Sequence, residues 1–538
     1  MAVCFADVVS RRSVLRALGM TPLGFLSPLE FLGGLKASPS LGSVSSPPVP
    51  LRALRAHTER LVAFKQKRAG SEGLSEVKGF LKERLEALGF SVQTDAFQFL
   101  AYRPKGDSLS IDGRDVLHET FAYSSGLVGR FPLVPLEGRP GLAPSLKGAI
   151  ALAPIESFNE VSLAYQRAIH EGFVAIVFSH RGCPAYPFAS SMGFAFDGLQ
   201  KESIPSLSIP FDAITPLLER LGKGDVFADV MIESDTEPAL GENLYAFSQK
   251  NPGSAPLMLL AAHFDTWFEG ATDDCASVAL LLELAGALKR AYPQANFGFL
   301  FLDAEEVGLL GAYRALQTLV IKNGFSIKAF LNLEQAVVSP KGFTSSTFSA
   351  PRLFFDAFSQ TLFGASGGVP VPAFLRLAWS GGASLSNLVP FYNAGVPSLT
   401  TGPISVPAFN HTPADTLEKV TDEALTDAFR FMFGLAASVH EGGLGLGGGG
   451  LSVPEAPKMV FERKESGLEV HIVPAFLPGT IDALVLNIGF LPVSKPRLEP
   501  LGNGRYRLET LEPFEGNSDT FLFVRFLGPI PAEGWLKL

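Results

Sequence analysis

Acidic and histidine side chains gather in four short segments in the middle of the chain. Those that could bind a metal ion are His263, Asp273, Glu305, Glu306, Glu334 and His411. Imidazole nitrogen and carboxylate oxygen are ligands that zinc takes in catalytic sites, where one position stays open for water. Two histidines, one aspartate and two glutamates would be five ligands, which is more than one ion needs. Two ions about 3.5–4 Å apart, bridged by one carboxylate, would use all five.

Such a pair of ions would activate a water molecule for hydrolysis. The ions would hold the water between them, lower its pKa and stabilise the oxyanion of the tetrahedral intermediate. The water also needs a proton acceptor. Of the adjacent Glu305 and Glu306, one can bind metal while the other takes the proton and later passes it to a leaving amine.

The elements that must position these residues are buried strands and the loops after them. Three nearly continuous apolar runs are found at 256–262, 296–303 and 326–334. Such runs are typical of strands in a largely parallel sheet that helices cover on both faces. His263, Glu305 and Glu334 stand at the carboxyl ends of these runs. Because the functional crevice of an open α/β sheet lies outside those ends, we expect the three residues to converge.

Each feature taken alone has a simpler explanation. Adjacent acids such as Asp273 and Asp274 can cap the helix that follows them. A loop histidine, or an acid that ends a strand, can face water. These explanations do not account for all the segments together, so we favour a metal site. The remaining histidines lack such neighbours and are expected to be structural, namely His57, His118, His170, His180, His440 and His471.

Composition and charge limit the class of protein. The 538 residues are too many for one core, since domains are roughly 100–200 residues long. An apolar fraction of 47% excludes a disordered or fibrous chain, and a net charge of −9 without a basic cluster argues against nucleic acid as a partner. No segment is suited to a stable membrane span. Three cysteines exclude a disulfide scaffold, so Cys183 and Cys275 are expected to be separate buried thiols.

The chain divides into six expected parts. Residues 1–40 place Arg11 and Arg12 before a moderately apolar stretch, which resembles a bacterial twin-arginine signal for export to the periplasm or the medium. The alternative is an amphipathic first helix of the mature protein. The other parts are the start of a catalytic domain at 41–115, an α/β insert at 116–240, the rest of the catalytic domain at 241–441, a Gly-rich linker at 442–452 and a sandwich-like all-β domain at 453–538. The expected fold class is α/β, with a mostly parallel or mixed sheet between helices.

Four motifs carry the ligand candidates other than Glu334: AAHFDT at 261–266, EGATDDCASVA at 269–279, DAEEVGLLGA at 303–312 and FNHTPADTLEKV at 409–420. They resemble metallopeptidase family 28, the co-catalytic di-zinc exopeptidases of the bacterial leucyl aminopeptidase type. The resemblance covers 243–420, together with RAGSEG at 68–73. It implies the zinc exopeptidase fold, two zinc ions per chain and peptide substrates.

The resemblance also implies a role for each residue. His263 would bind one zinc, Glu306 and His411 the second, Asp273 would bridge both, and Glu334 would be the remaining ligand. Glu305 would be the general base, and Asp265 would orient the imidazole of His263. The family usually has Asp where this chain has Glu334, and the extra methylene changes the reach of that carboxylate.

Two regions differ from the core pattern of the family. The segment 386–391 is SNLVPF, where the family commonly has Ser-Asp-His-x-Pro-Phe, so a charge and an imidazole are missing near the substrate cleft. Neither binds metal in the family, so we expect hydrolysis to survive while pocket shape or specificity differs. The insert at 116–240 resembles a protease-associated domain, which implies substrate gating or protein contact.

The leading hypothesis is an exported zinc aminopeptidase that hydrolyses N-terminal residues from peptides, through a metal-bridged water with Glu305 as base. A carboxypeptidase of the same family shares these ligands and is an alternative. A glutaminyl cyclase-like enzyme, which has the same helix start and double glutamate, would hold one zinc. A receptor-like binding protein is the nonenzymatic alternative, although all five ligand positions here keep coordinating side chains.

Overall fold

The computed structural model describes most of the chain after residue 46. The described residues are 47–136, 148–156, 159–191, 204–337, 343–348, 376–378, 386–394, 396–403, 407 and 409–441, together with eight strands between 458 and 537. The expected export signal at 1–40 and the Gly-rich linker at 442–452 lie outside these residues. No helix in the described part is long and apolar enough to cross a membrane.

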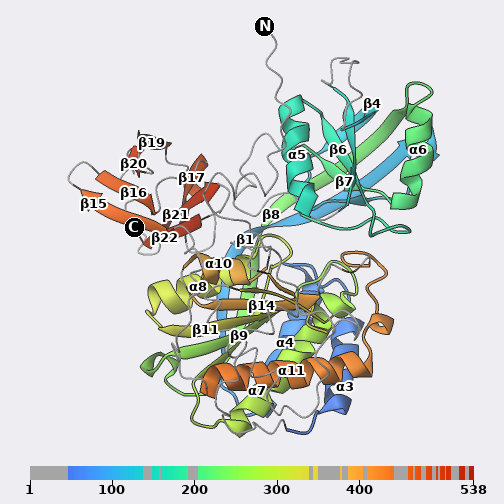
Figure 1. The fold of residues 1–538 in the computed structure, drawn as a ribbon. Helices are drawn as coiled ribbons and strands as arrows, with labels where there is room; N and C mark the ends of the chain where they lie inside the picture. The colour runs from blue at the N-terminus through green and yellow to red at the C-terminus, as the bar shows by residue number, and fades with distance from the viewer. Residues whose placement is uncertain are drawn as a thin grey trace, which may run out of the picture. The chain divides into compact units, whose positions relative to one another are not determined.

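A mixed sheet forms the centre of the catalytic region (Figure 1). Its neighbouring strands, in spatial order, are β14 (Ser398–Pro403), β11 (Ile327–Leu333), β9 (Leu257–His263), β10 (Phe297–Leu302) and β8 (Phe227–Phe247). The first four run parallel, and β8 is antiparallel to β10. Since every residue of β9 and β10 is buried, these apolar runs are central strands, as the sequence predicted.

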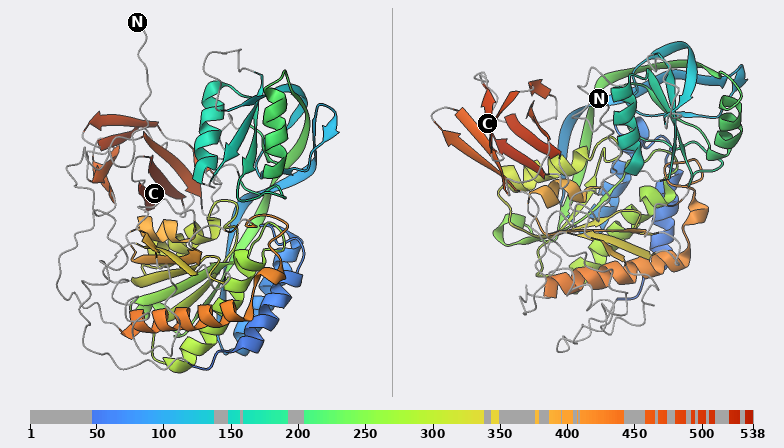
Figure 2. Two further views of the ribbon diagram at one scale, coloured as in Figure 1. Left: turned by 45° about the vertical axis from the view of Figure 1, so that its right-hand side comes forward. Right: turned by 45° about the horizontal axis from the view of Figure 1, so that its top comes forward.

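Helices cover both faces of this sheet (Figures 1 and 2). On one face lie α3 (Leu51–Ala63), α4 (Glu72–Ala87), α7 (Ala276–Ala291) and α11 (Asp422–Glu441), and on the other lie α8 (Leu310–Leu316) and α10 (Leu388–Asn393). Helix α7 is apolar around most of its circumference because it packs on β9 with one side and on α3 and α11 with others. The predicted α/β class with a mixed sheet between helices is confirmed.

Apolar residues stand at helical spacing within 51–88, and the structure has two helices there rather than one. Helix α3 ends at Ala63 and α4 begins at Glu72. Gly70 lies between them with φ +76°, a left-handed conformation that favours glycine, and the hydroxyl of Ser71 then caps α4 by accepting from the N–H of Leu74 at 3.3 Å. Gly89, with φ +77°, follows α4.

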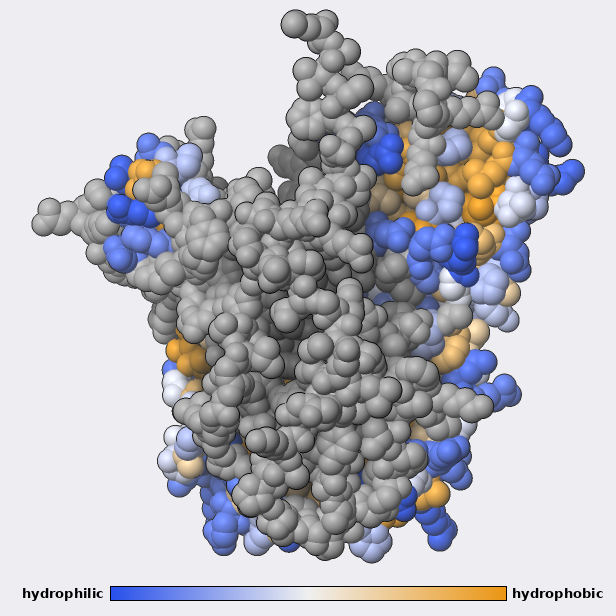
Figure 3. Space-filling view, in the orientation of Figure 1, coloured by the Kyte–Doolittle hydropathy of each residue, from blue (hydrophilic) through white to orange (hydrophobic). Residues whose placement is uncertain are grey.

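The region of the expected insert continues the same sheet. Strands β1 (Val92–Ile111) and β8 pair along nearly their whole length, and β8 passes the expected boundary at residue 240 without a break. The other elements are β2 (Arg114–Asp115), β3 (Glu119–Thr120), β4 (Leu127–Pro135), β5 (Ile150–Ile155), α5 (Asn159–Glu171), β6 (Ala175–His180), β7 (Ser206–Ser208) and α6 (Ile214–Leu221). They pack around two apolar clusters of their own. An apolar area is visible on this region in the space-filling view (Figure 3).

The remaining described strands lie at the edge of the large sheet and after residue 457. The edge strands are β12 (Phe343–Phe348) and β13 (Arg376–Ala378). The later strands form two four-stranded antiparallel sheets, one of β15 (Lys458–Lys464), β16 (Gly467–Val473), β20 (Arg505–Glu509) and β19 (Arg497–Gly502), the other of β18 (Pro492–Ser494), β17 (Thr480–Asn487), β21 (Thr520–Leu527) and β22 (Ala532–Lys537). The sandwich-like domain stays a prediction.

Cys183 and Cys275 are both buried and free, as expected.

Candidate metal centre

The predicted ligands converge beyond the carboxyl ends of β9, β10 and β11. His263 is the last residue of β9, and its Nε2 lies 3.2 Å from Oδ1 of Asp273 and 3.4 Å from Oε1 of Glu334. Nε2 of His411 lies 3.1 Å from Oδ2 of Asp273 and 3.2 Å from Oε2 of Glu306. The carboxylate of Asp273 therefore stands between two imidazoles and turns one oxygen toward each.

Several buried atoms of this cluster have no hydrogen-bond partner among the described residues. They are Nε2 of His263, Oδ1 of Asp273, Oδ2 of Asp274 and Oε1 of Glu306. Polar atoms deep in a protein normally have partners, because leaving one unpaired costs about 1–3 kcal/mol. Nitrogen and carboxylate oxygen that meet without partners fit the coordination of a metal ion. The residues present thus suit the metal that the sequence predicted.

The titration of the cluster reflects an excess of negative charge. Burial opposes a charge on His263 and on His411, but the surrounding carboxylates outweigh it and raise the pKa of both imidazoles well above the usual value. Burial raises the pKa of Glu306 to about 7. Two protonated histidines hold the pKa of Asp273 far below its usual range in spite of burial. A cluster that draws protons so strongly would equally attract cations.

Asp265 contacts both the backbone of Glu305 and Glu306 and the imidazole of His263. Its carboxylate accepts the backbone N–H of Glu305 at 3.0 Å and that of Glu306 at 3.1 Å. The ring Nδ1 of His263 lies 3.0 Å from the backbone carbonyl oxygen of Asp265 and 3.6 Å from its carboxylate. Because 3.6 Å is too long for a good hydrogen bond, the backbone of Asp265 orients the imidazole and its side chain fixes the next strand end.

Glu305 lies beside the ligands, as its position after β10 predicted. Its side chain places an oxygen within 4.8 Å of ligand atoms of His263 and Glu334. Burial raises the pKa of Glu305 well above its usual value, and the carboxylates of Glu334 and Glu306 raise it further. A buried carboxylate with a raised pKa at the rim of a metal cluster is suited to accept a proton.

The loop that carries Asp273 is held by Asp415, a residue that our sequence interpretation gave no role. Oδ1 of Asp415 accepts from the backbone N–H of Thr272 at 3.0 Å and from its hydroxyl at 2.9 Å, and Oδ2 accepts from the N–H of Asp273 at 3.1 Å. Asp415 follows His411 by four residues in the motif FNHTPADTLEKV, which was the available sequence signal. The loop of one ligand thus fixes the loop of another.

Gln335 is a second residue that sequence reasoning missed. Its backbone N–H donates to Oδ1 of Asp274 at 2.9 Å, and its Nε2 donates to Oδ2 of Asp273 at 3.2 Å. Only its position next to Glu334 could have indicated it. Gly270 begins the same loop with φ +54°, where a Cβ would lie 2.4 Å from the backbone oxygen of Asp273, so glycine is required there.

An aromatic and cationic layer borders His411. The ring of Trp267 packs edge-on against the imidazole of His411, with centroids 6.3 Å apart. The guanidinium of Arg68, from the segment RAGSEG, lies 5.5 Å from the Trp267 centroid and pairs with Glu119 at 3.2 Å. The N-terminal helical region and the insert therefore both contribute side chains near this ligand.

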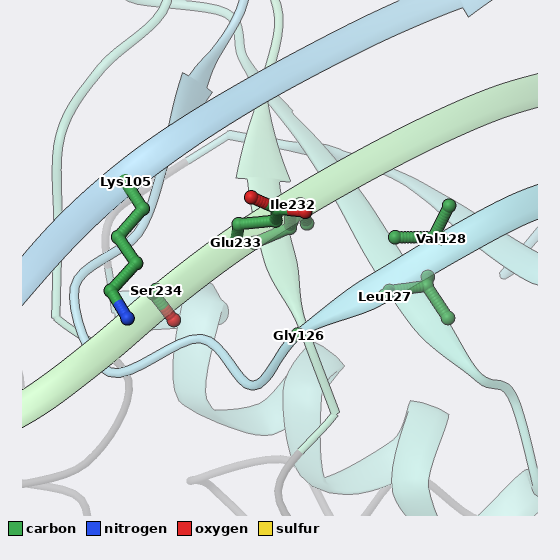
Figure 4. A pocket seen from close by; sticks show the side chains of 7 residues that line it. All are labelled: Lys105, Gly126, Leu127, Val128, Ile232, Glu233 and Ser234. Carbon is green, nitrogen blue, oxygen red and sulfur yellow. The ribbon is translucent and has the colours of Figure 1, made fainter.

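Two other features are separate from this centre. The surface hollow in Figure 4 is lined by Lys105, Gly126, Leu127, Val128, Ile232, Glu233 and Ser234, none of which is a predicted site residue. His471, Glu462 and Glu469 also place ligand atoms close together. Arg505, however, already donates to Glu469 at 2.6 Å and supplies a positive charge there, so His471 fits the structural role expected of it.

The divergent segment 386–391 leads into α10. The hydroxyl of Ser386 lies 3.0 Å from that of Thr400 in β14, and Asn387 is fully buried. Its consequence for the substrate pocket stays a prediction.

Comparison with known proteins gives the family. Residues 244–436 match peptidase family M28. A lipoprotein aminopeptidase of Mycobacterium tuberculosis is 24% identical over 288 residues, which cover 51% of this chain and 55% of that protein. An aminopeptidase of Pseudomonas aeruginosa is 26% identical over 296 residues, which cover 49% of this chain and 53% of that protein. The chain spans about half the length of the curated relatives it matches.

Solved structures share the fold. A zinc aminopeptidase from Bacillus subtilis superposes with a TM-score of 0.58 at 20% identity, covering 73% of this chain and 95% of that one. A peptidase M28 precursor from Shewanella amazonensis superposes with a TM-score of 0.60 at 19% identity, covering 72% and 93%. The family match and the shared fold confirm the expected family and architecture. Residues 244–436 are thus the part of the chain that matches peptidase family M28.

Proposed function

We propose that this protein is an exported zinc-dependent aminopeptidase that hydrolyses N-terminal residues from peptides. The observation that carries the proposal is the carboxylate of Asp273, which turns one oxygen toward His263 and the other toward His411. A bridging carboxylate of this kind fits two metal ions better than one. Relatives described as aminopeptidases, and a neighbour described as a zinc aminopeptidase, support the metal and the polarity of cleavage.

We assign the ligands by proximity. His263 and Glu334 would hold one zinc, His411 and Glu306 the other, and Asp273 would bridge them. Zinc, when bound, supplies Lewis-acid chemistry that polarises a peptide carbonyl and makes water a better nucleophile. The longer side chain of Glu334, in place of the usual Asp, lies 3.4 Å from the imidazole of His263, which is compatible with a shared ligand position.

Glu305 would take the proton from the attacking water and give it to the leaving amine. Its backbone N–H donates to the carboxylate of Asp265, which helps to place the side chain beside the ligands. Burial and neighbouring carboxylates raise its pKa, which strengthens it as a proton acceptor once cations are present to keep it ionised.

Export is the remaining part of the proposal. The arginine pair at Arg11 and Arg12 precedes a moderately apolar stretch, which suits a twin-arginine signal. One relative is described as a lipoprotein. Fusion of residues 1–40 to a reporter that folds before export would test it, with Arg11→Lys and Arg12→Lys together as the control that should keep the reporter inside the cell.

The activity test is mass spectrometry of defined short peptides, some beginning with Gln, incubated with the purified protein. Loss of N-terminal residues that stops with a zinc chelator and returns with added zinc is the expected result. Zinc content near two per chain would support the bridged pair. Trimming from the C-terminus would reverse the polarity, and loss of ammonia from Gln peptides alone would indicate a cyclase. Zinc-loaded protein that leaves every peptide unchanged would contradict an enzymatic role.

A further inference from the structure

We propose that the α/β insert is a structural part of the metal centre. Its residue Ala189 positions His411, because the backbone carbonyl of Ala189 keeps the ring proton on Nδ1 and leaves Nε2 available to the metal. This inference rests on the proposed function, since it concerns the same zinc site. It goes beyond the gating or protein contact expected of such an insert.

Two reciprocal contacts join the insert to His411. Nδ1 of the imidazole lies 3.1 Å from the carbonyl oxygen of Ala189, and the N–H of Ala189 donates to the carbonyl oxygen of His411 at 2.7 Å. A carbonyl oxygen only accepts hydrogen bonds, so the proton between it and the ring belongs to Nδ1. Nε2, on the other side of the ring, faces Asp273 and Glu306. The contact thus selects the tautomer that a metal at Nε2 requires.

The insert holds Ala189 firmly. The hydroxyl of Ser208, in β7, accepts from the N–H of Phe188 at 2.9 Å and donates to the carbonyl of the same residue at 2.7 Å. The N–H of Ala122 donates to the carbonyl of Ser190 at 2.9 Å. Ala189 therefore lies between two anchored neighbours, and its carbonyl points where the core of the insert places it.

Phe188 adds an apolar anchor to these hydrogen bonds. Its side chain is fully buried and packs against Phe121, with centroids 5.1 Å apart, and against His180 at 6.0 Å. Both aromatic partners belong to the insert. Movement of this short segment would expose a buried ring and break paired backbone groups, so the position of Ala189 follows the folding of the insert.

The two imidazoles of the centre differ in how they are oriented. His263 ends a buried central strand, and its Nδ1 partner is only two residues away at Asp265. His411 lies in a loop with φ +54°, and its Nδ1 partner is 222 residues away in the sequence. Loss of the insert contact should therefore weaken metal binding at His411 and spare the position beside His263.

The test uses the full-length protein and a substitution that loosens the segment without touching the ligands. Ser208→Ala removes the hydroxyl that serves both backbone groups of Phe188, and the loss of these two buried hydrogen bonds should loosen the segment. Ser179→Ala is the matched control, because this buried hydroxyl of the insert has no hydrogen-bond partner in the described part of the chain. Ser208→Thr keeps the hydroxyl and should restore the contact.

Zinc affinity is measured by competition with chelators of graded strength, which separates the two ions. For Ser208→Ala we expect about tenfold weaker binding of one zinc, the lower end of the roughly 10–100-fold effect of losing a partner of a ligand. The other zinc should change less than about twofold, and Ser208→Thr and Ser179→Ala should resemble the wild type. Denaturant unfolding of each variant establishes that it folds.

If Ser208→Ala does not fold, Ala189→Pro loosens the same segment at the reciprocal contact, because proline lacks the N–H that donates to the carbonyl oxygen of His411. A folded variant that binds both zinc ions as the wild type does would overturn this inference and leave the proposed function standing. Equal weakening of both ions would overturn it as well, since it would indicate a general loss of stability. A wild-type protein that binds no zinc would overturn the proposed function, and this inference with it.

Discussion

The substitution Asp415→Asn tests whether the loop that carries His411 holds the loop that carries Asp273 in place for zinc binding. The carboxylate accepts three hydrogen bonds, two at Oδ1 from Thr272 and one at Oδ2 from the N–H of Asp273. Asparagine keeps one acceptor oxygen, so it can still serve Thr272. Its NH₂ group would face the N–H of Asp273, where two donors meet and neither is satisfied.

The magnitude follows from the lost bond. A hydrogen bond to a charged group contributes about 1.5–3 kcal/mol, and an unpaired buried N–H costs about 1–3 kcal/mol. The loop can relax and recover part of this, so we expect a net loss of about 1.5–3 kcal/mol in the free energy of zinc binding. At about 1.4 kcal/mol for each factor of ten, this corresponds to a roughly 10- to 100-fold weaker affinity.

The assay is zinc competition followed by peptide hydrolysis with saturating zinc. Burial raises the pKa of Asp415 to about 6, so measurements at pH 8 compare the amide with an ionised carboxylate. With zinc restored, we expect the variant to recover most of its turnover, because Asp415 positions a ligand and does not touch the reacting atoms. Glu418→Gln, an exposed acid three residues away, is the matched control. A folded Asp415→Asn protein with wild-type zinc affinity would refute the reasoning.

Three further changes test the base, a buried acid and a close contact. Glu305→Gln should lower turnover by about 10²–10⁴-fold at unchanged zinc content, and parallel loss of zinc would identify Glu305 as a ligand. Burial, followed by the charge of Asp265, raises the pKa of Asp303 to about 7. The stability that protonation of Asp303 contributes is fully present below about pH 4 and is lost as pH rises through 7. Between pH 5 and 8 the wild type should therefore lose about 2 kcal/mol of unfolding free energy relative to Asp303→Asn, as measured by denaturant titration. A difference between the two proteins that does not change with pH would contradict this. Gly311→Ala places a Cβ 2.3 Å from the backbone oxygen of Asp303 and should cost about 1–3 kcal/mol or more by the same titration, whereas Gly79→Ala, in open space, should not destabilise.

The sequence predicted that the ligand candidates converge, because their positions follow from a rule of topology. In a parallel sheet the carboxyl ends of neighbouring strands meet at one edge, so residues that end β9, β10 and β11 must approach one another. His411 and Asp273 lie in loops, and only the motifs around them indicated their place. The identity of each side chain was informative because imidazole and carboxylate groups are rarely buried together without a function.

The sequence did not predict which groups hold the ligands in place. Asp415 and Gln335 act through hydrogen bonds across the fold, and such pairs have no periodicity or spacing to reveal them. Asp265 was expected to orient His263, and its backbone carbonyl oxygen lies 3.0 Å from Nδ1 of that imidazole; the sequence did not indicate that its carboxylate also binds the backbone of the double glutamate. The break between α3, which ends at Ala63, and α4, which begins at Glu72, falls in the polar segment that contains Gly70.

The groups that hold the ligand candidates in place come from distant parts of the sequence. Three segments that carry ligand candidates are each held by a group from another part of the fold: Asp265 binds the backbone of Glu306, Asp415 that of Asp273, and Ala189 contacts the ring of His411. The carboxylates of the cluster also repel one another: after burial, the charge of Asp273 adds to the raised pKa of Glu306, and the charge of Glu334 adds to that of Glu305. Loops held only by their own ends would move apart under this repulsion. Because the supports resist that movement, the ligands can stay close enough to receive cations, and a change in any support should reach the metal through the loop it holds.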